Sequence, residues 1–442
     1  MTRDQTIPET IGGLGRTVPA TPVRRLTTGW HQTRGPANLR QHLARFGGLP
    51  RPGRQLVTMV TAAGLTGRGG AAFPTGIKMQ SVAAGRGPKV VVANGMEGEP
   101  ASDKDQALLG RAPHLVLDGA VLAAEAVGAG TVHLCLDRAR YQQIDEVAHA
   151  ISERERAGYG SIRLLIHDLP SRYVSSEETS LVRWLNGGDA RPVLTPPRPS
   201  DRGVQRRPTL VDNVETLAHV AMIARFGPAW FREAGPADAP GSMLTTVSGD
   251  VTYPGVYEVE SGIPVGQVLA LASAAAGAEA VLLGGYGGTW QRVSTVASLP
   301  LTPAGLRPAG ASPGAGVFAV LPANGCGIRE TARILGYLAG ESARQCGPCQ
   351  FGLAAIAGDF AQLATGRLHS DPLQRLRRRL GVIPGRGACQ HPDGAVRLAA
   401  SALTAFAADL RAHAARHPCP AAQRGRQAAV LPIPHGATEG WR

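Results

Sequence analysis

The feature that most limits the fold of this chain is a regular alternation of two residue patterns between residues 51 and 240. Short runs rich in Val, Ile and Leu alternate with longer stretches that are alanine-rich or amphipathic. The predicted elements are strands at 89–94, 131–137 and 162–169 and helices at 114–129 and 141–156. Because parallel neighbouring strands need a long crossover connection, this alternation predicts a parallel sheet covered by helices.

The pattern changes twice further along the chain. From about residue 241, short β-branched strands surround a Tyr-Pro-Gly turn, which is typical of a small α+β unit. From about residue 324, four successive helical patterns predict a bundle, and the last of them, at 395–417, reads as a single long helix. The expected organisation is an N-terminal arm at 1–50 that is partly disordered, with one short helix near 37–46, an α/β domain at 51–240, an α+β domain at 241–323, a helical domain at 324–417 and a flexible tail at 418–442.

The charge of the chain does not indicate nucleic-acid binding. The formal net charge is +13, but Lys78, Lys89 and Lys104 are the only lysines, and the arginines are scattered along the sequence. We find no motif in the sequence that interleaves aromatic and basic residues, as many RNA-binding modules do. We therefore expect no nucleic-acid partner.

The sequence predicts neither a signal peptide nor a membrane span. Residues 1–20 lack an apolar core, and no run of about 18 apolar residues is free of charges and turn signals. A hydrophobic content of 43% over 442 residues is sufficient for several globular domains. We expect a cytoplasmic protein without direct membrane insertion.

The cysteines divide into one buried thiol and a possible metal site. Six cysteines are too few for a disulfide scaffold, and a reducing cytosol favours thiol or metal roles. Cys135 lies in a predicted strand, where an inert core thiol is expected. Cys346 and Cys349 form a CxxC pair at a predicted helix start, and Cys389 follows about forty residues later. Because thiolates are the usual ligands of iron–sulfur clusters, these three are candidate metal ligands.

Three further segments carry polar or glycine-rich motifs. The stretch GLTGRGGAAFPTGIKM at 64–79 can form an anion-binding nest of backbone amides, although a plain glycine-rich turn explains it equally well. The loop within 90–105 follows a strand, which is where α/β proteins place their ligands. In 208–220, Asn213 or Thr216 can cap a helix whose N-terminus faces a phosphate, or can serve as an ordinary cap.

Taken in order, these segments resemble a known family. The chain is similar to the flavin-carrying, NADH-oxidising subunit of bacterial respiratory complex I, the 51 kDa or F-subunit family, and to its relatives in hydrogenases and formate dehydrogenases. The segments that carry the resemblance, which covers about residues 50–400, are GLTGRGGAAFPTGIK, NGMEGEP, SRYVSSEETSL, PTLVDNVETL and the CxxC pair. The resemblance implies an FMN-binding α/β domain, a soluble-ligand-binding β-grasp domain and a helical domain that holds one [4Fe–4S] cluster.

The resemblance also implies roles for individual residues. The glycine loop, with Gly67, Arg68, Gly69 and Gly70, wraps the flavin. Lys78 lies beside the ribityl phosphate, and Phe73 stacks on the nicotinamide nucleotide unless it is a core side chain. The residues expected to line the flavin are Asn94, Glu97, Glu177, Asn213 and Thr216, and the acidic neighbours of the nucleotide are Glu99 and Glu178. Glu97 is the candidate catalytic residue, although the hydride-to-single-electron conversion belongs to the flavin itself.

The sequence departs from the family pattern at three positions in the flavin site. Met96 replaces an aspartate that contacts the flavin, Ser176 replaces a glycine that allows close approach, and Asp212 replaces the first of two paired asparagines. A carboxylate at position 212 is unfavourable beside a phosphate unless it points away. The segment NGMEGEP also resembles the loop of the Rnf-type C subunit, which uses the same flavin domain. The departures therefore leave flavin binding in place and weaken the case for NADH as the donor.

The cluster segment lacks one of the family's four cysteines. Ala343 takes the place of the first, while Cys346, Cys349 and Cys389 match the other three. Three outcomes stay open: a [4Fe–4S] cluster with a substitute fourth ligand, a [3Fe–4S] cluster, or an empty site with packed cysteines. The candidate substitutes are His391, which is nearest in sequence, Cys326, Ser342 and Cys419.

The leading hypothesis is an electron-transfer flavoprotein. In it, FMN accepts a hydride from NADH, and electrons pass through the cluster to a ferredoxin or another redox subunit. A thioredoxin-like [2Fe–2S] subunit is a further candidate partner. Two alternatives stay open: reduced ferredoxin as the donor, and a scaffold subunit that kept the fold and lost its cofactors, for which Ala343 is the best support.

Overall fold

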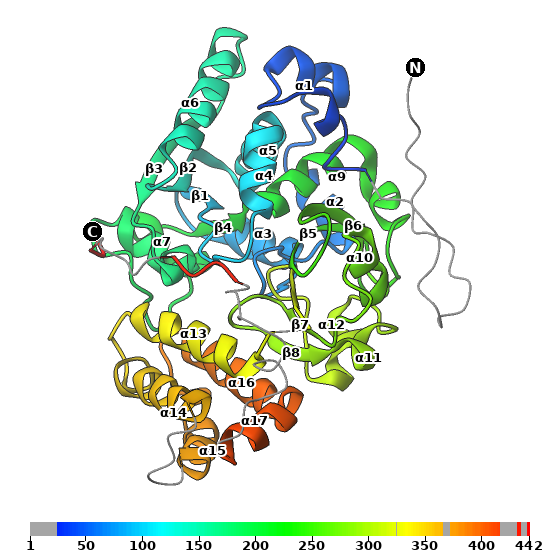
Figure 1. The fold of residues 1–442 in the computed structure, drawn as a ribbon. Helices are drawn as coiled ribbons and strands as arrows, with labels where there is room; N and C mark the ends of the chain where they lie inside the picture. Colours follow the sequence, from blue (N-terminus) through cyan, green and yellow to red (C-terminus); the bar gives the residue numbers. More distant parts are fainter. Residues whose placement is uncertain (1–23, 324, 366–371, 416–430, 435–439) are drawn as a thin grey trace, which may run out of the picture.

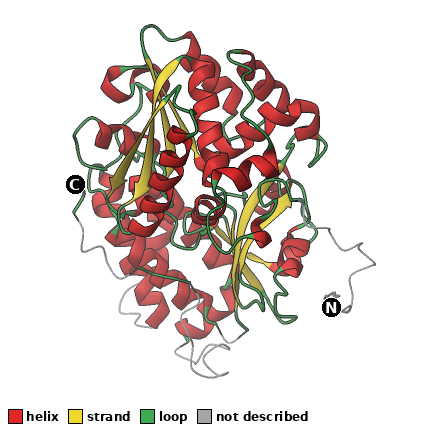
Figure 2. Cartoon of the chain, turned by 90° about the horizontal axis from the view of Figure 1, so that it is seen from above, coloured by secondary structure: helices red, strands yellow, loops and turns green. Residues whose placement is uncertain are grey.

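The structure is a computed structural model that describes residues 24–323, 325–365, 372–415, 431–434 and 440–442. It contains two sheets and a group of helices that follows them in the chain (Figure 1). Seen from above, helices surround both groups of strands (Figure 2).

The first sheet is parallel throughout. Its strands are β1 (Lys89–Gly95), β2 (Ala129–Asp137), β3 (Arg163–Leu169) and β4 (Thr209–Asn213). They lie in the order β3-β2-β1-β4, and every neighbouring pair is parallel, which confirms the parallel sheet predicted from the sequence. Asn94 and Asn213 are register partners, so the polar residues after β1 and β4 reach the same edge of the sheet.

Helices pack on both faces of this sheet, because alternate residues of β1 enter different hydrophobic clusters. Val91 and Ala93 belong to a cluster with the long helices, whereas Val90 and Val92 belong to a smaller one that includes Leu181 of α7. The helices of this part are α1 (Leu39–Phe46), α2 (Gln55–Ala63), α3 (Thr75–Ala84), α4 (Lys104–Arg111), α5 (Pro113–Val127), α6 (Tyr141–Arg156), α7 (Glu178–Leu185), α8 (Pro199–Arg202) and α9 (Val214–Arg232). A side chain at Gly119 would collide with the backbone of Leu217, so glycine lets α5 and α9 approach closely.

The second sheet is mixed. Its strands are β5 (Ser242–Gly249), β6 (Gly255–Glu260), β7 (Ala280–Leu283), β8 (Thr289–Arg292) and β9 (Val317–Leu321), in the order β6-β5-β9-β7-β8, and its helices are α10 (Val265–Leu271), α11 (Val293–Val296) and α12 (Pro303–Leu306). Only β5 and β9 form a parallel pair among these neighbours. The N-terminal arm is anchored here, because Glu258 on β6 accepts the amides of Arg25 at 2.8 Å and Leu26 at 3.0 Å. Residues 1–23 of the predicted arm lie outside the described residues.

Helices make up the last large part of the structure. They are α13 (Gly327–Gly340), α14 (Leu353–Thr365), α15 (Pro372–Val382), α16 (His391–Ala405) and α17 (Ala407–Ala414). The prediction of one long helix at 395–417 is wrong, because the backbone leaves the helical conformation at Phe406 (φ −112°, ψ 34°). The Phe406 ring packs edge-on against Trp290, with 5.2 Å between centroids, and this tertiary contact accompanies the break.

Two stretches of the predicted tail are packed against the body of the protein, where the composition predicts a loose segment. Leu431 is buried, and its amide donates to Glu330 at 3.0 Å. Further on, Ala190 donates its amide to the carbonyl of Trp441 at 2.8 Å. The chain therefore returns from the helices to the neighbourhood of α7 (Figure 1).

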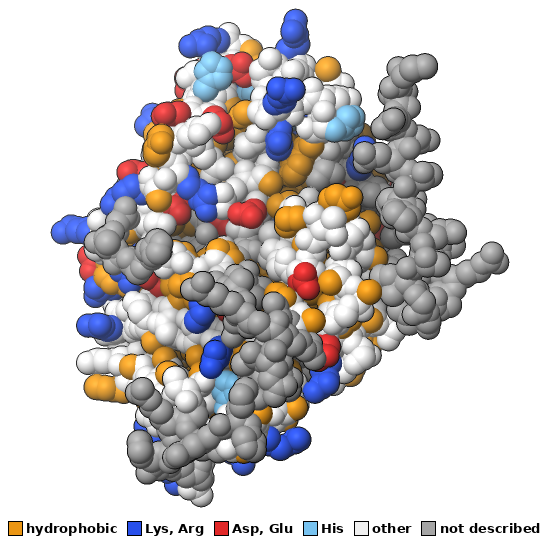
Figure 3. Space-filling model, viewed as in Figure 1, with side chains coloured by type: hydrophobic (Ala, Val, Ile, Leu, Met, Phe, Trp, Pro, Cys, Tyr) orange, Lys and Arg blue, Asp and Glu red, His pale blue; other side chains and the backbone are white. Residues whose placement is uncertain are grey.

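Burial and surface charge bear on two other expectations. Cys135 is fully buried, and burial raises the pKa of its thiol far above the ordinary range, as expected of an inert core residue. Lys and Arg side chains are spread over the face seen in Figure 3, with acidic side chains among them.

In the part of the chain that is described, no single helix has the length and apolar character of a membrane span. The pair α4 and α5, bent by 97°, resembles a broken span only in its length and composition.

Candidate functional site

The glycine loop connects α2 to α3 and lies over the start of α9. Its ends are held together by a hydrogen bond of 2.9 Å from the amide of Gly67 to the carbonyl of Phe73. The amide of Arg68 donates to Oγ1 of Thr216 at 2.9 Å, which fixes the loop against α9. Gly70 has a φ of 102°, a conformation that favours glycine, and it is exposed together with Gly69. The loop therefore presents bare backbone to an incoming ligand.

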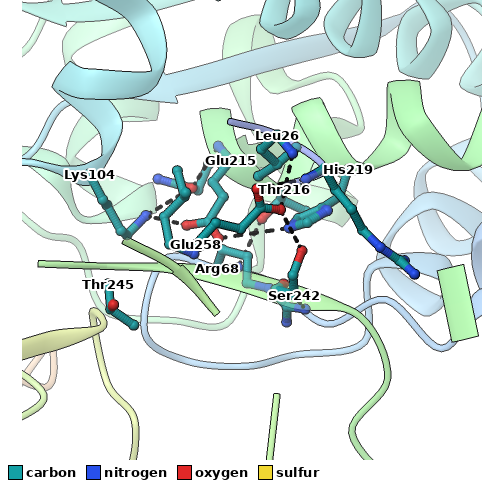
Figure 4. A network of polar contacts seen from close by, with 12 residues as sticks. Leu26, Arg68, Lys104, Glu215, Thr216, His219, Ser242, Thr245 and Glu258 are labelled. Carbon is teal, nitrogen blue, oxygen red and sulfur yellow. Dashed lines mark hydrogen bonds and ion pairs between the residues drawn. The ribbon is translucent and has the colours of Figure 1, made fainter. Parts of the chain in front are cut away.

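The Arg68 side chain anchors this loop to the protein interior. It extends into a buried polar network that includes Ser242 and Glu215 (Figure 4). It donates to the carbonyl of Ser242 at 3.1 Å and to Oγ1 of Thr66 at 2.8 Å. In the same network Lys104 pairs with Glu215 at 2.9 Å, and both side chains are almost completely buried. The guanidinium thus links the loop to β5. A ligand of the loop would therefore contact the backbone of Arg68 rather than its side chain.

Lys78 on α3 provides a partly exposed cation beside the loop. Its Nζ donates to the carbonyl of Val211 at 2.8 Å and lies 3.5 Å from Asp212 and 3.7 Å from Glu178. Burial opposes the charged form, but the carboxylates of Asp212 and Glu178 outweigh it and raise the pKa of Lys78. Burial also raises the pKa of Asp212, although Lys78 acts against this. Asp212 therefore points toward the cation rather than away from it.

The remaining flavin-lining candidates gather at the carboxyl ends of β1 and β4. Asn94 donates from Nδ2 to the carbonyl of Ser176 at 2.9 Å, which joins the end of β1 to the segment before α7. Glu177 is the N-cap of α7 and accepts the amides of Thr179 and Ser180. Asn213 caps α9 by accepting the amide of Glu215 at 2.9 Å, so the capping expected of Asn213 is present.

Glu97 and Glu99 are held in two different ways. Glu97 is 8% exposed and accepts the amides of Asp105 and Gln106, each at 3.1 Å, so its carboxylate caps α4. Burial, followed by the charge of Asp105, raises the pKa of Glu97 to about 7. Glu99 accepts the amide of Tyr286 at 2.8 Å and the hydroxyl of Tyr173 at 3.3 Å, and burial raises its pKa to about 7. Glu99 therefore links the end of β1 to the second sheet.

These residues fit a flavin mononucleotide. The exposed backbone at Gly69 and Gly70 suits a flat ring system and a phosphate, Lys78 supplies a cation, and Phe73 offers a ring that is 41% exposed. Two carboxylates beside Lys78, those of Asp212 and Glu178, oppose a phosphate because they carry the same sign of charge. Oδ2 of Asp212 is buried and has no hydrogen-bond partner in the described part of the chain. A cavity of about 910 Å³ lies elsewhere, beside β6 and α10, and none of the predicted site residues lines it.

The three matching cysteines come together near this site. Cys346 and Cys349 flank the start of a π-helical turn, Pro348–Gly352, that leads into α14, and Cys389 precedes α16. Burial raises the pKa of Cys389 to about 12, and the charges of Glu177, Cys349 and Cys346 act in the same direction. The three sulfurs therefore lie within electrostatic range of one another and of Glu177 at the flavin site.

This donor set fits three corners of an iron–sulfur cluster. Within the described ranges, no three His, Cys, Asp or Glu side chains are grouped as a site for one metal ion. An iron–sulfur cluster does not require its protein ligands to converge on one metal ion, because each thiolate binds a different iron. Ala343 is buried and belongs to the same hydrophobic cluster as Cys349, so a packed methyl group stands where the family has a cysteine.

The structure separates the four candidate substitutes. Ser342 lies beside Cys349, with 2.9 Å between Oγ and Sγ. Cys326 precedes α13, whereas Ala343 follows it, and a helix of 14 residues is about 21 Å long. His391 begins α16, two residues after Cys389. Cys419 lies outside the described residues.

Sequence reasoning missed an aromatic group between the two sites. Tyr173 contacts His391 and Tyr337, with ring centroids 5.1 Å and 6.1 Å apart, and Tyr286 lies 5.9 Å from Tyr337. The amide of Tyr173 donates to the carboxylate of Glu341 at 2.9 Å. The sequence does contain an indication of this aromatic group, because Tyr173 is the aromatic residue inside the segment SRYVSSEETSL.

Comparisons with known proteins agree with this geometry. Residues 60–222 match the family described as Nuo51 FMN-binding domain, and residues 329–413 match the NADH-ubiquinone oxidoreductase-F iron-sulfur binding region. The chain is 33% identical over 394 residues to the second NADH-quinone oxidoreductase F subunit of Rhizobium meliloti (strain 1021), covering 83% of this chain and 90% of that protein. It is 31% identical over 377 residues to the NADH-quinone oxidoreductase F subunit of Streptomyces coelicolor, covering 83% of this chain and 84% of that protein.

A solved structure is similar over most of the chain. A chain of an NAD⁺-reducing [NiFe]-hydrogenase, crystallised in the air-oxidised state, superposes with a TM-score of 0.78 at 30% sequence identity. The match covers 88% of this chain and 66% of that one. The likeness therefore extends across both sheets and into the helices, beyond the glycine loop alone.

Proposed function

Because the chain belongs to the F-subunit family of NADH-quinone oxidoreductases, we propose that it carries FMN and an iron–sulfur cluster and passes electrons from NADH to a redox partner. The family places the protein among oxidoreductase subunits. The bound FMN would supply the conversion of a hydride into single electrons. The contribution of this chain is to hold and orient the groups that react.

One observation carries the proposal: the segment 172–180 contacts both candidate sites. On one side, the carbonyl of Ser176 accepts Nδ2 of Asn94 at the flavin site. On the other side, Arg172 and Tyr173 both bind Glu341, which precedes the cluster cysteines. A segment fixed at both ends holds a flavin and a cluster at a defined separation, and electron transfer between them depends on that separation.

The site residues form two groups, one for FMN and one for the nicotinamide nucleotide. The loop backbone from Gly67 to Gly70 and the Lys78 cation would hold FMN, with Asn94, Glu177, Asn213 and Thr216 around it. The exposed ring of Phe73 is suited to stacking on a nicotinamide nucleotide. Glu99 and Glu178 would be its acidic neighbours, and Glu97, which caps α4, stays the candidate catalytic residue.

The finer assignments extend this proposal to the rest of the chain. The five-stranded mixed sheet would be a β-grasp domain that positions the helices, and the helices would form the iron–sulfur domain. The acceptor would be a ferredoxin or another redox subunit, with a thioredoxin-like [2Fe–2S] subunit as a further candidate. The protein would act in the cytoplasm, without inserting into a membrane.

The test is anaerobic purification followed by an absorption spectrum and by iron and sulfide analysis. We expect flavin absorption together with iron and sulfide, and we expect NADH to bleach the flavin. A matched pair of variants, Lys78→Ala in the site and Lys89→Ala outside it, checks that the flavin occupies the proposed place: the first should bind FMN more weakly and the second should bind it as the wild type does. Lys89 has no role in the proposed site.

Two results would favour the alternatives. Flavin and iron that NADH leaves oxidised, but that reduced ferredoxin reduces, would assign ferredoxin as the donor, as the departures at Met96 and Ser176 allow. A colourless protein from a cofactor-replete preparation would contradict the catalytic proposal and favour a scaffold subunit.

A further inference from the structure

The cluster region contains a buried imidazole, that of His391, whose hydrogen bonding indicates which ring nitrogen carries the proton. His391 is 7% exposed, and its Nε2 lies 2.8 Å from the carbonyl oxygen of Leu338. A carbonyl only accepts hydrogen bonds, so the ring proton sits on Nε2. Nδ1 of the neutral ring is then a bare lone pair, and it is buried without a hydrogen-bond partner in the described structure. An unsatisfied buried acceptor of this kind calls for an explanation.

The position of this histidine supplies the explanation. It follows Cys389 by two residues, and its backbone amide hydrogen-bonds the Cys389 sulfur. Its partner Leu338 lies near the end of α13, the helix that leads into Ala343. The ring is thus held against the end of α13, the helix that leads into Ala343, while the backbone of His391 is held against the third cysteine.

The arrangement of the ring is the one found for metal-bound histidines. Such residues usually donate one ring N–H to a backbone carbonyl or a carboxylate, which fixes the tautomer and leaves the other nitrogen for the metal. Building on the proposed function, we propose that Nδ1 of His391 is the fourth ligand of the cluster, in place of the cysteine absent at Ala343. The cluster is then a [4Fe–4S] centre with three thiolates and one imidazole.

The other described candidates are less suited to this role. The hydroxyl of Ser342 donates to the carbonyl of Cys349 at 2.8 Å and accepts the amide of Arg344 at 3.2 Å. These two hydrogen bonds hold the local loop together and already engage the hydroxyl. A serine must also lose a proton before it ligates iron. The Cys326 sulfur lies 3.6 Å from Nε2 of His413, at the start of α13, whereas Ala343 follows the other end of that helix.

The proposal has a consequence for the cluster itself. Replacing a thiolate by a neutral imidazole removes one negative charge, and in other iron–sulfur centres such a replacement raises the reduction potential. The variant His391→Cys should therefore keep the cluster and lower its potential.

The decisive experiment uses the full chain, anaerobically reconstituted and then reduced, with histidine labelled by ¹⁵N in the imidazole ring only. Ring labelling matters, because the backbone amide of His391 also lies against the Cys389 sulfur. Pulsed EPR should show ¹⁵N hyperfine coupling to the cluster in the wild type and in Ser342→Ala. The coupling should disappear in His391→Cys, with the iron content unchanged.

Two further variants guard against a misfolded protein. His391→Ala should lose one iron and give the EPR signal of an oxidised [3Fe–4S] centre. Adding Ala343→Cys to this variant should restore the fourth iron without restoring the ¹⁵N coupling. Iron at the wild-type level without ring coupling, or coupling that survives in His391→Cys, would overturn the proposal and leave the proposed function intact. A wild-type chain that takes up no iron would overturn both.

Discussion

The carboxylate of Glu341 lies 2.9 Å from Nε of Arg172, and the same carboxylate oxygen accepts the amide of Tyr173. The two charged side chains are 4% and 9% exposed. They join the segment before the candidate cluster cysteines to the segment beside the proposed flavin site, although 169 residues separate them in the chain. A buried ion pair therefore lies on the boundary between the two proposed cofactor sites.

Removing one member of this pair should destabilise the protein strongly. Glu341→Gln leaves the buried Arg172 guanidinium without its carboxylate, which costs about 3–5 kcal/mol in comparable cases. The control is Asp168→Asn, in the exposed pair with Arg138, where the loss should stay below about 1 kcal/mol. Urea unfolding of the three proteins measures the difference. Equal losses in the two variants would show that the pair does not hold the segments together.

Local patterns predicted the sheet correctly because strand and helix periodicity are properties of neighbouring residues. The break at Phe406 could not be predicted in this way, since the ring finds its partner at Trp290, more than a hundred residues earlier. The same holds for Tyr173, whose contacts with Glu99, Glu341 and His391 exist only once three distant segments meet. The sequence predicts which residues belong to the site, whereas tertiary contacts decide where each side chain points.

Lys78 and Asp212 should have opposite effects on FMN affinity. Lys78→Ala removes the cation proposed for the phosphate, and Asp212→Asn removes the negative charge 3.5 Å from it. We expect the first to weaken FMN binding and the second to strengthen it, each by about tenfold, which corresponds to ~1.4 kcal/mol. Titration of the deflavinated protein measures this.

Riboflavin serves as the control ligand, because it lacks the phosphate. Neither substitution should change riboflavin affinity by more than about twofold if both residues act on the phosphate. Equal effects on FMN and riboflavin would place the phosphate away from Lys78.

Glu99 should make stability fall as the pH rises. Its pKa is raised by burial from 4.5 to about 7 in the folded protein, so between these values the folded state binds more protons than the unfolded state. The free energy of unfolding then decreases from about pH 4.5 to about pH 7 and levels off above it. In Glu99→Gln this contribution should vanish, so the variant should be more stable than the wild type at pH 8 and equal to it near pH 4.

The measurement is the midpoint of urea unfolding at several pH values. The amide side chain introduced by Glu99→Gln keeps an oxygen that can accept the amide of Tyr286, so the comparison isolates the charge. A pH profile that is identical in both proteins would show that folding leaves the pKa of Glu99 unchanged.

Trp441 should contribute measurably to stability through its ring. The guanidinium of Arg172 lies 4.1 Å from the centre of the ring and that of Arg191 lies 5.1 Å from it. A cation over an aromatic face contributes about 0.5–1 kcal/mol when exposed and about 2 kcal/mol when desolvated, so Trp441→Ala should cost about 1–2 kcal/mol in urea unfolding. The backbone bond from Ala190 to residue 441 remains in this variant, which isolates the ring.

Arg442→Ala provides the matched control for the same segment. Arg442 contacts the carbonyl of Gly187 at 3.1 Å from an exposed position, and surface changes of this kind usually stay within about 0.5 kcal/mol. Because Arg172 also holds Glu341, loss of the Trp441 ring should additionally loosen the ion pair between the two proposed sites. A double-mutant cycle of Trp441→Ala with Glu341→Gln should therefore be non-additive, by at least about 0.5 kcal/mol. Strict additivity would mean that the packed end of the chain stabilises α7 without acting on the pair.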